Sequence, residues 1–370
     1  MICSNCAEPG GSIICPECKI EDVGRIQTYY CSEQCRSEDR SNHELTCHER
    51  KRLGRAVASL SEIWDKFCRQ THTSRYRLDR VDGSTVYLTR QKELAETCAL
   101  MGRPIFQHFP EDIMTQDAGL AVEQAVLYHN MCVDSLSTGL PLIKALLEPY
   151  CHTLKELSVR PKDPTIQVVS TNETVDVNHA VLYIRLYSNE EFVMDLTGSQ
   201  YGWAEKLYTW TDYERYRGKV CYVFDLGASR EFTTSLMEGH AINSAPRSGC
   251  DIRRIISHEV AQDIINYFKD CAKSVDQFMG LENMNQQRDL TMRAKDTITK
   301  AIEDLVIRSG VGRMCLLFEN GISTPVVVRS EELARKLVSV WFTQEEVQAC
   351  RGQFEALQLE MQHRLHEEEV

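Results

Sequence analysis

The sequence predicts an α+β protein in three parts: a small cysteine-rich N-terminal unit, a mixed α/β body and a mainly helical C-terminal region. Seven of the 16 cysteines fall between residues 3 and 47, a density typical of metal binding in a reducing compartment. β-branched and aromatic runs fill the middle of the chain. From residue 252 onward, apolar residues recur at spacings of three and four, which indicates helices. We therefore expect domains over residues 1–50, 51–250 and 251–370.

Composition and charge exclude several classes of protein. Hydrophobic residues make up 42% of the 370 and charged residues 26%, so wholesale disorder is excluded. The net charge of −12 comes with no concentrated basic face, so we expect no nucleic-acid partner. We find neither an apolar run of membrane-spanning length nor a secretory leader in the sequence, and we expect no membrane association. The expected location is the cytoplasm or the nucleus.

Eight candidate metal ligands occur in four pairs. They are Cys3 and Cys6, Cys15 and Cys18, Cys31 and Cys35, and His43 and Cys47. With two intervening residues, one tight turn can aim both side chains at the same ion; with three, the two side chains share a helical face. Because zinc takes four nitrogen or sulfur ligands, eight ligands predict two zinc ions. Fifty residues bury too little apolar surface to fold alone, so zinc binding would supply much of the folding free energy.

The segment TYYCSEQCRSEDRSNHELTC, residues 28–47, resembles the end of a MYND zinc finger. The matching positions are Tyr30, Cys31, Ser32, Cys35, Asp39, His43 and Cys47. Two positions depart from the family pattern, because Arg36 stands where Gln is usual and Arg40 where Trp is usual. The segment MDLTGSQYG, followed by Trp210 and Tyr213, also resembles a stretch of fungal MYND-finger proteins whose bodies have no assigned chemistry.

The MYND resemblance implies a cross-brace fold with two closed, structural zinc sites. It implies that one zinc is held by Cys3, Cys6, Cys31 and Cys35, and the other by Cys15, Cys18, His43 and Cys47. It also implies a protein partner for the finger, such as a short proline-containing peptide. The predicted function is therefore a zinc-binding scaffold or regulatory adaptor, and no catalytic residue is assigned.

In the body, four runs predict strands at residues 165–170, 179–187, 191–197 and 219–226. The second and third should form an antiparallel hairpin that turns at residues 188–190. Residues 111–148 show helical spacing. Farther on, Asn320 and Gly321 predict a hairpin turn, and Thr343 with Glu346 forms a capping box that predicts the start of the last helix.

An alternative function is a thiol enzyme that uses His179 and Asp195. These residues begin and end the predicted hairpin, and a carboxylate that orients a histidine is part of a Cys-His-Asp acyl-transfer triad. The pattern loosely resembles the transglutaminase-like and papain-like enzymes, or an inactive descendant of them. Cys132 and Cys151 are the candidate nucleophiles, although Cys132 is predicted to lie inside a helix. The deciding observation is whether a cysteine sulfur reaches the His179 ring.

Two further motifs that would indicate an enzyme are missing from the sequence: the methyl-donor motif of a SET-domain methyltransferase and a glycine-rich loop for binding nucleotide phosphates. A SET-domain methyltransferase needs an Asn-His-Ser-Cys type of motif, and the nearest string, GHAINSAPRSGC at residues 239–250, lacks it. No glycine-rich phosphate loop is present either.

Overall fold

The computed structural model describes residues 1–17, 23–24, 26–72, 76–90, 109, 119–170, 178–239, 246–270, 284–302, 313–319 and 322–328. Its helices are α1 (Glu33–Glu38), α2 (Arg40–Gln70), α4 (Leu120–Leu127), α5 (Cys132–Ser137), α6 (Leu140–Leu146), α7 (Trp210–Tyr216), α8 (Ala228–Gly239), α9 (Pro246–Asp270) and α11 (Met284–Ile302), with short 3₁₀ turns η1 (Glu148–Tyr150) and η2 (Gly198–Tyr201). Its strands are β1 (Ile13–Ile14), β2 (Tyr29–Tyr30), β3 (Tyr76–Asp82), β4 (Thr85–Arg90), β5 (Thr153–Pro161), β6 (Gln167–Ser170), β7 (His179–Arg185), β8 (Glu191–Met194), β9 (Leu207–Thr209), β10 (Gly218–Asp225), β11 (Arg313–Glu319) and β12 (Ile322–Val328).

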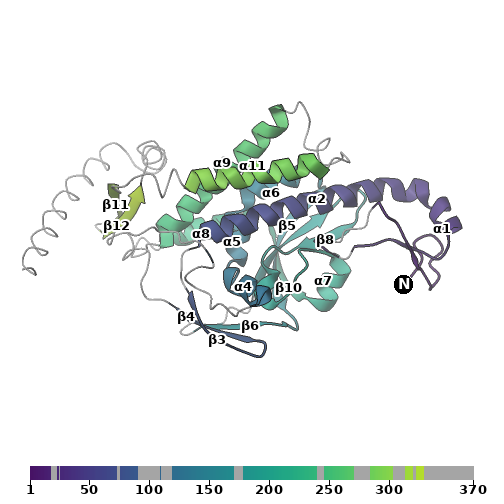
Figure 1. Ribbon diagram of the computed structural model, residues 1–370, viewed down its shortest axis with the longest axis horizontal. Helices are drawn as coiled ribbons and strands as arrows, with labels where there is room; N and C mark the ends of the chain where they lie inside the picture. The colour runs from purple at the N-terminus through teal and green to yellow at the C-terminus, as the bar shows by residue number, and fades with distance from the viewer. Residues whose placement is uncertain are drawn as a thin grey trace, which may run out of the picture.

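The body is built on a five-stranded antiparallel sheet in the order β10-β5-β7-β8-β9. Helices α2, α6, α9 and α11 form a layer beside it (Figure 1), and the contacts join α2 to α6 and α11, and α9 to α6 and α11. One large hydrophobic core lies between these layers, with Leu60, Trp64 and Phe67 of α2 fully buried beside Leu182 and Ile184 of β7. Mixed helix and sheet packed around this core confirm the predicted α+β class.

Helix α2 connects the cysteine-rich N-terminal region, residues 1–47, to the body. This region, which we call the head, lies at one end of the molecule, and α2 leads from it across the body (Figure 1). Apolar residues recur every three or four positions from Leu53 to Phe67, so one face of the second half enters the core. The first half carries His43 and Cys47. A single helix of 31 residues therefore holds both metal-ligand candidates and core side chains.

Most predicted strands are confirmed. The hairpin of β7 and β8 turns at residues 186–190, where Asn189 adopts a positive φ of 66°. The Asn320–Gly321 signal is flanked by the paired strands β11 and β12, and Gly83, with φ of 58°, lies in the turn between β3 and β4. The run at 165–170 contains β6, which pairs in parallel with β4 in a separate three-stranded sheet.

The helical prediction for residues 111–148 is only partly right. Residues 119–148 are described, and they contain the three short helices α4, α5 and α6 and the start of η1. Asn130 takes a positive φ of 57°, which breaks the helix after α4 and makes Cys132 the first residue of α5. The prediction that Cys132 lies inside a helix is therefore wrong. The predicted helix start at Thr343 and residues 111–118 lie outside the described residues.

Strand β5 is an element that the sequence did not predict, although it is an interior strand of the sheet, between β10 and β7. Its sequence, TLKELSVRP, alternates only in part, and the charged Glu156 is buried on it. That carboxylate accepts hydrogen bonds from the backbone N–H groups of Gly227 and Ser229, each at 2.7 Å. A buried charge satisfied by a distant loop cannot be read from local periodicity.

The expected domain boundaries at residues 50 and 250 fall inside α2 and α9, so neighbouring parts share a helix. Whether the three parts fold separately stays a prediction. Among the helices that the structure describes, none combines the length and apolar character needed to cross a bilayer.

Candidate metal centre and a buried histidine–aspartate pair

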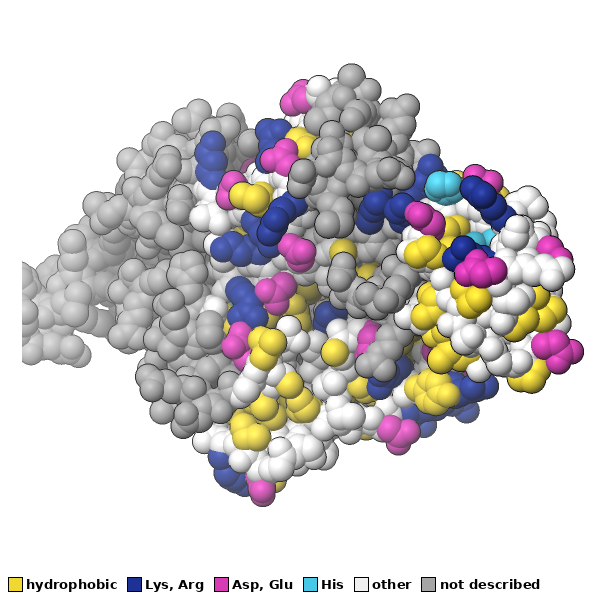
Figure 2. Space-filling view, turned by 45° about the vertical axis from the view of Figure 1, so that its right-hand side comes forward, with side chains coloured by type: hydrophobic (Ala, Val, Ile, Leu, Met, Phe, Trp, Pro, Cys, Tyr) yellow, Lys and Arg dark blue, Asp and Glu magenta, His cyan; other side chains and the backbone are white. Residues whose placement is uncertain are grey.

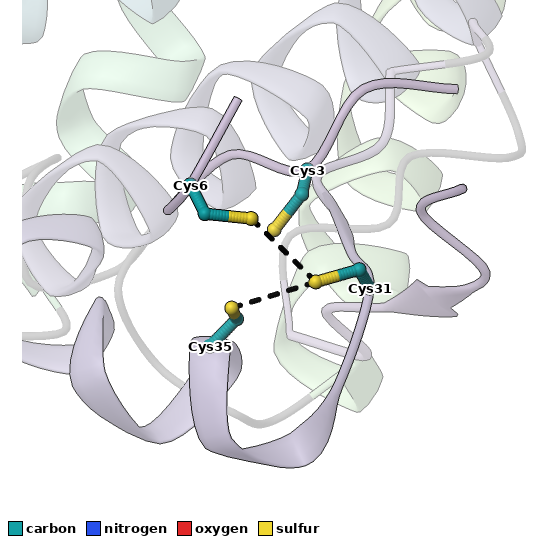
Figure 3. Close-up of side chains that lie close together, drawn as sticks. All are labelled: Cys3, Cys6, Cys31 and Cys35. Atoms are coloured by element: carbon teal, nitrogen blue, oxygen red, sulfur yellow. Dashed lines mark hydrogen bonds between the residues drawn. The ribbon is translucent and has the colours of Figure 1, made fainter. Parts of the chain in front are cut away.

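Four cysteines from two segments of the head gather their sulfurs at one point: Cys3, Cys6, Cys31 and Cys35 (Figure 3). Their ligand atoms all lie within 4.8 Å of one another. The Cys31 sulfur is 3.6 Å from that of Cys6 and 3.5 Å from that of Cys35, far beyond the length of a disulfide bond. A tetrahedral zinc site with bonds of about 2.3 Å places its sulfurs about 3.8 Å apart. The spacing is therefore that of a tetrathiolate metal site.

Local structure explains why these sulfurs converge. The Cys3 N–H donates to the Glu8 carbonyl oxygen at 2.9 Å, and the Ala7 N–H donates to the Cys3 carbonyl oxygen at 3.0 Å, which closes a tight turn around the first pair. Ser32 caps α1 by accepting a hydrogen bond from the Cys35 N–H at 3.1 Å. Cys31 therefore directly follows β2, and Cys35 lies one helical turn later in α1, with its sulfur 3.5 Å from that of Cys31.

Backbone N–H groups favour the thiolate in this cluster. The N–H of Cys6, and then those of Cys31 and Asn5, point at the Cys3 sulfur and lower the pKa of Cys3 to about 6. The neighbouring sulfurs, first that of Cys35, raise the pKa of Cys31 to about 12, because adjacent thiolates repel one another. A bound divalent cation would remove this repulsion and allow all four thiols to ionise.

A second group of candidate ligands combines one cysteine that directly follows β1 with two residues that lie one helical turn apart on α2. Cys15, His43 and Cys47 have ligand atoms within 4.8 Å of one another, and the sulfurs of Cys15 and Cys47 are 3.8 Å apart. Burial, and then the positive charge of Arg50, lower the pKa of His43, so its ring is held in the neutral form that binds metals. The predicted fourth ligand, Cys18, lies outside the described residues.

The pairing of segments is interleaved: the first and third ligand pairs meet, and Cys15 of the second pair meets the fourth. This is the order that a cross-brace requires. The two groups could hold two metal ions: the first offers four thiolates, and the second offers two thiolates and one imidazole among the described residues. Thiolate and imidazole are donors that zinc prefers. The first group already supplies four protein ligands, so such an ion would have a structural role.

The head is fixed to the body by polar contacts just beyond the ligands. Arg50 donates from Nε to Glu190 at 2.6 Å and from Nη1 to Thr28 at 2.5 Å, and its other nitrogen also pairs with Glu190. The Glu49 carboxylate accepts from the Ser188 N–H at 2.9 Å. The two acceptor and donor residues of the body, Glu190 and Ser188, lie in the turn between β7 and β8. The orientation of the head is thus set by the same hairpin that carries His179.

Replacing Glu190 with Gln is expected to lower the free energy of unfolding by about 1–3 kcal/mol, because it leaves the half-buried Arg50 guanidinium without its carboxylate. Urea denaturation would measure the loss. Lys51→Met is the matched control, since Lys51 pairs with Glu17, whose side chain is 65% exposed, and should change stability by less than about 0.5 kcal/mol. Equal effects of the two substitutions would contradict a specific role for the Arg50 contacts.

A second cluster of reactive groups lies in the body, at the end of the β7–β8 hairpin. His179 Nε2 is 2.9 Å from Asp195 Oδ2, and neither side chain has any exposed surface. The Cys132 thiol is within hydrogen-bonding range of the same ring. Cys151 is buried elsewhere beside Glu49, and burial raises its pKa to about 12. Of the two candidate nucleophiles, Cys132 is therefore the one placed to act with the pair.

Several residues around this pair had no distinguishing signal in the sequence. The Gln200 side-chain nitrogen is 3.3 Å from His179 Nδ1, and the Tyr213 hydroxyl is 3.4 Å from Asp195 Oδ2. The rings of Tyr201 and Trp203 meet the His179 ring edge to face at centroid distances of 5.0 and 6.3 Å. Tyr201, Trp203 and Tyr213 therefore surround the His179–Asp195 pair.

The fold and donor set define the class of this protein: an α+β protein with an N-terminal cysteine/histidine head able to hold metal ions. No family model, no curated protein and no solved structure matches the chain. A finer assignment of the head therefore depends on its own residues and geometry.

Proposed function

We propose that the head is a two-zinc, MYND-type finger that binds a protein partner, and that the chain works as a scaffold or regulatory adaptor. The observation that carries this proposal is the interleaved pair of ligand groups with sulfur–sulfur distances of 3.5–3.8 Å. Two closed sites would supply structure and leave no coordination position for a substrate. A surface held rigid by two metal ions is suited to binding a protein partner.

Charge favours protein over nucleic acid as the partner. Residues 1–50 contain five Lys and Arg against nine Asp and Glu, and the thiolates of bound sites would add negative charge. Figure 2, which turns the head forward, shows hydrophobic side chains among polar and acidic ones on this face. Met1, Ile2 and Leu45 are each more than 60% exposed. An apolar, acidic surface fits a peptide with apolar and basic side chains, and the MYND resemblance adds proline to that description.

The metal part of the proposal is tested by elemental analysis of the purified chain. We expect two zinc ions per chain in the wild type and about one in Cys31→Ser and in His43→Gln, because each substitution removes a ligand from a different site. Cys221→Ser is the control, since Cys221 lies on β10 away from the head, and it should keep both ions. Two zinc ions in either ligand variant, or fewer than two in the control, would contradict the assignment.

The partner is tested by adding a panel of proline-containing peptides to the isotope-labelled full chain and following its amide resonances. The expected result is a set of shifts confined to residues 1–50 that disappears after chelation. Shifts that persist without metal, or that fall only in the body, would overturn the role of the head. Compartment, cytoplasm or nucleus, stays an expectation from sequence.

A further inference from the structure

The cluster around His179 has the order of groups that activates a thiol. Asp195 contacts one ring nitrogen, Nε2, at 2.9 Å. The Cys132 thiol contributes a hydrogen bond to the same ring, and the Gln200 amide nitrogen is 3.3 Å from the other ring nitrogen, Nδ1. The thiol of Cys132 and the carboxylate of Asp195 therefore both contact the imidazole of His179, as the nucleophile and the orienting carboxylate do around the base of a catalytic triad.

The carboxylate is held in place as an acceptor. The Thr197 N–H donates to Asp195 Oδ1 at 3.2 Å, and the Tyr213 hydroxyl donates to Oδ2 at 3.4 Å. The Asp195 N–H donates to the Lys206 carbonyl oxygen at 2.9 Å, which fixes the backbone to the start of β9. A methyl group on Gly198 would come within 2.7 Å of Asp195 Oδ2, so this turn leaves room only for glycine. These contacts orient Asp195 toward the ring.

The thiol is the member of the set that approaches solvent. His179 and Asp195 are fully buried, whereas Cys132 at the start of α5 is partly exposed. Helix α5 packs against β7, which brings the cysteine over the strand that begins with His179. A solvent-reachable nucleophile above a buried base and carboxylate is the arrangement that a thiol enzyme needs.

We propose that Cys132, His179 and Asp195 form a nucleophilic thiol site for acyl transfer from carboxamide substrates. This site is separate from the metal-bound head and does not depend on the function proposed for it. Gln200 lies beside the same ring: its side-chain nitrogen is 3.3 Å from His179 Nδ1, and its oxygen accepts a hydrogen bond from the Asn130 N–H at 3.3 Å.

Each step balances with groups in this site and water. His179 Nδ1 takes the thiol proton as the Cys132 sulfur forms a bond to the carbonyl carbon. The tetrahedral intermediate then breaks its carbon–nitrogen bond, and the proton on His179 passes to the leaving amine, which departs as a free amine. Water next attacks the thioester, losing a proton to His179; the carbon–sulfur bond breaks, and that proton returns to the thiol, leaving a carboxylic acid.

The protonation of the ring agrees with this role. Burial alone lowers the pKa of His179, but the charge of Asp195 and its hydrogen bond outweigh burial and raise the pKa to about 10. A ring with such a pKa keeps at neutral pH the proton that it takes in the first step.

The test compares two thiols within one molecule. The full chain is treated with iodoacetamide between pH 5 and 9, and the alkylation rates of Cys132 and Cys221, both partly exposed, are read by peptide mass spectrometry. An ordinary thiol reacts about tenfold more slowly for each pH unit below about 8.5. We expect Cys132 to react at pH 6 at least 30-fold faster than Cys221, and His179→Gln to abolish this advantage. Equal rates at pH 6, or no labelling of Cys132, would overturn the proposal.

The acyl step is tested with p-nitrophenyl acetate. We expect one acetyl group on Cys132, a burst of p-nitrophenol of one equivalent, and loss of both in Cys132→Ser, which should remain folded because the replacement is nearly isosteric. If His179→Gln fails to fold, Gln200→Leu is the second variant: it removes the amide that contacts His179 Nδ1 and should slow the acetylation of Cys132 at least tenfold. Fast alkylation with no acetyl adduct on Cys132 would overturn acyl transfer.

Discussion

Removal of the bound metal by a chelator is expected to unfold residues 3–47 while the sheet and the second half of α2 keep their structure. Among the described residues of the head, the buried hydrophobic cluster separate from the body core consists of Tyr30 and three cysteines, Cys3, Cys15 and Cys47, which are themselves ligand candidates. Without an ion these thiolates repel one another. Structural zinc sites contribute about 10–16 kcal/mol in isolated finger peptides, which is more than such a cluster can replace.

Amide hydrogen exchange would measure this separation. Amides in β1, β2 and α1 should lose at least a thousandfold protection after chelation, whereas those from Leu53 to Phe67 should change by less than tenfold, because that half of α2 belongs to the body core. Restoring zinc should restore protection. The expectation fails if the head stays protected in metal-free protein, or if the whole of α2 unfolds together with it.

Replacing Asp195 with Asn is expected to lower the free energy of unfolding by about 3–5 kcal/mol near pH 7. The substitution removes one member of a fully buried charged pair and leaves the other, His179, with no anion beside it. Glu191→Gln on the neighbouring strand β8 is the control, because its side chain is exposed and its loss should cost less than about 0.5 kcal/mol.

The same substitution should change the pH dependence of stability. The pKa of His179 is raised to about 10 in the folded protein, against about 6.5 in an unfolded chain. The contribution of His179 to the free energy of unfolding is therefore fully present below about pH 6.5, and it is lost as the pH rises through about 10. In that window the wild type should lose up to ~1.4 kcal/mol per pH unit from this group.

In Asp195→Asn, burial would lower the pKa of His179, so this part of the slope should disappear. Urea midpoints from pH 6 to pH 10 give the difference between the two proteins, in which the titration of groups that Asp195 does not influence cancels; the pKa of Lys206 is one that Asp195 does influence. Parallel curves would show that Asp195 does not hold the charge on His179.

Local patterns were sufficient for the ligands and for most strands. Spacings of two and three residues between cysteines depend only on turn and helix geometry, so seven of the eight predicted ligands could be located and found in two groups. The β7–β8 hairpin followed from alternation and turn residues, and its register places His179 and Asp195 in contact as the sequence suggested. These features involve residues close together in the chain.

The position of Cys132 was predicted wrongly because it depends on one backbone angle. Helical spacing continues through residues 119–148, and nothing in the sequence shows that Asn130 adopts a positive φ and starts a new helix at Cys132. Strand β5 was missed because its buried Glu156 is satisfied by N–H groups more than 70 residues away. Gln200 is likewise significant only through its distance to His179.

The sequence by itself determined the metal-ligand set, the α+β class and the hairpin that pairs His179 with Asp195, because each is encoded by residues within a few turns or two adjacent strands. Only the tertiary structure decided that the head shares a helix with the body core, that Arg50 docks it on the β7–β8 turn, and that Cys132 lies over His179. These relations are set by packing between distant segments, and the free energy of that packing depends on the whole core rather than on any local pattern.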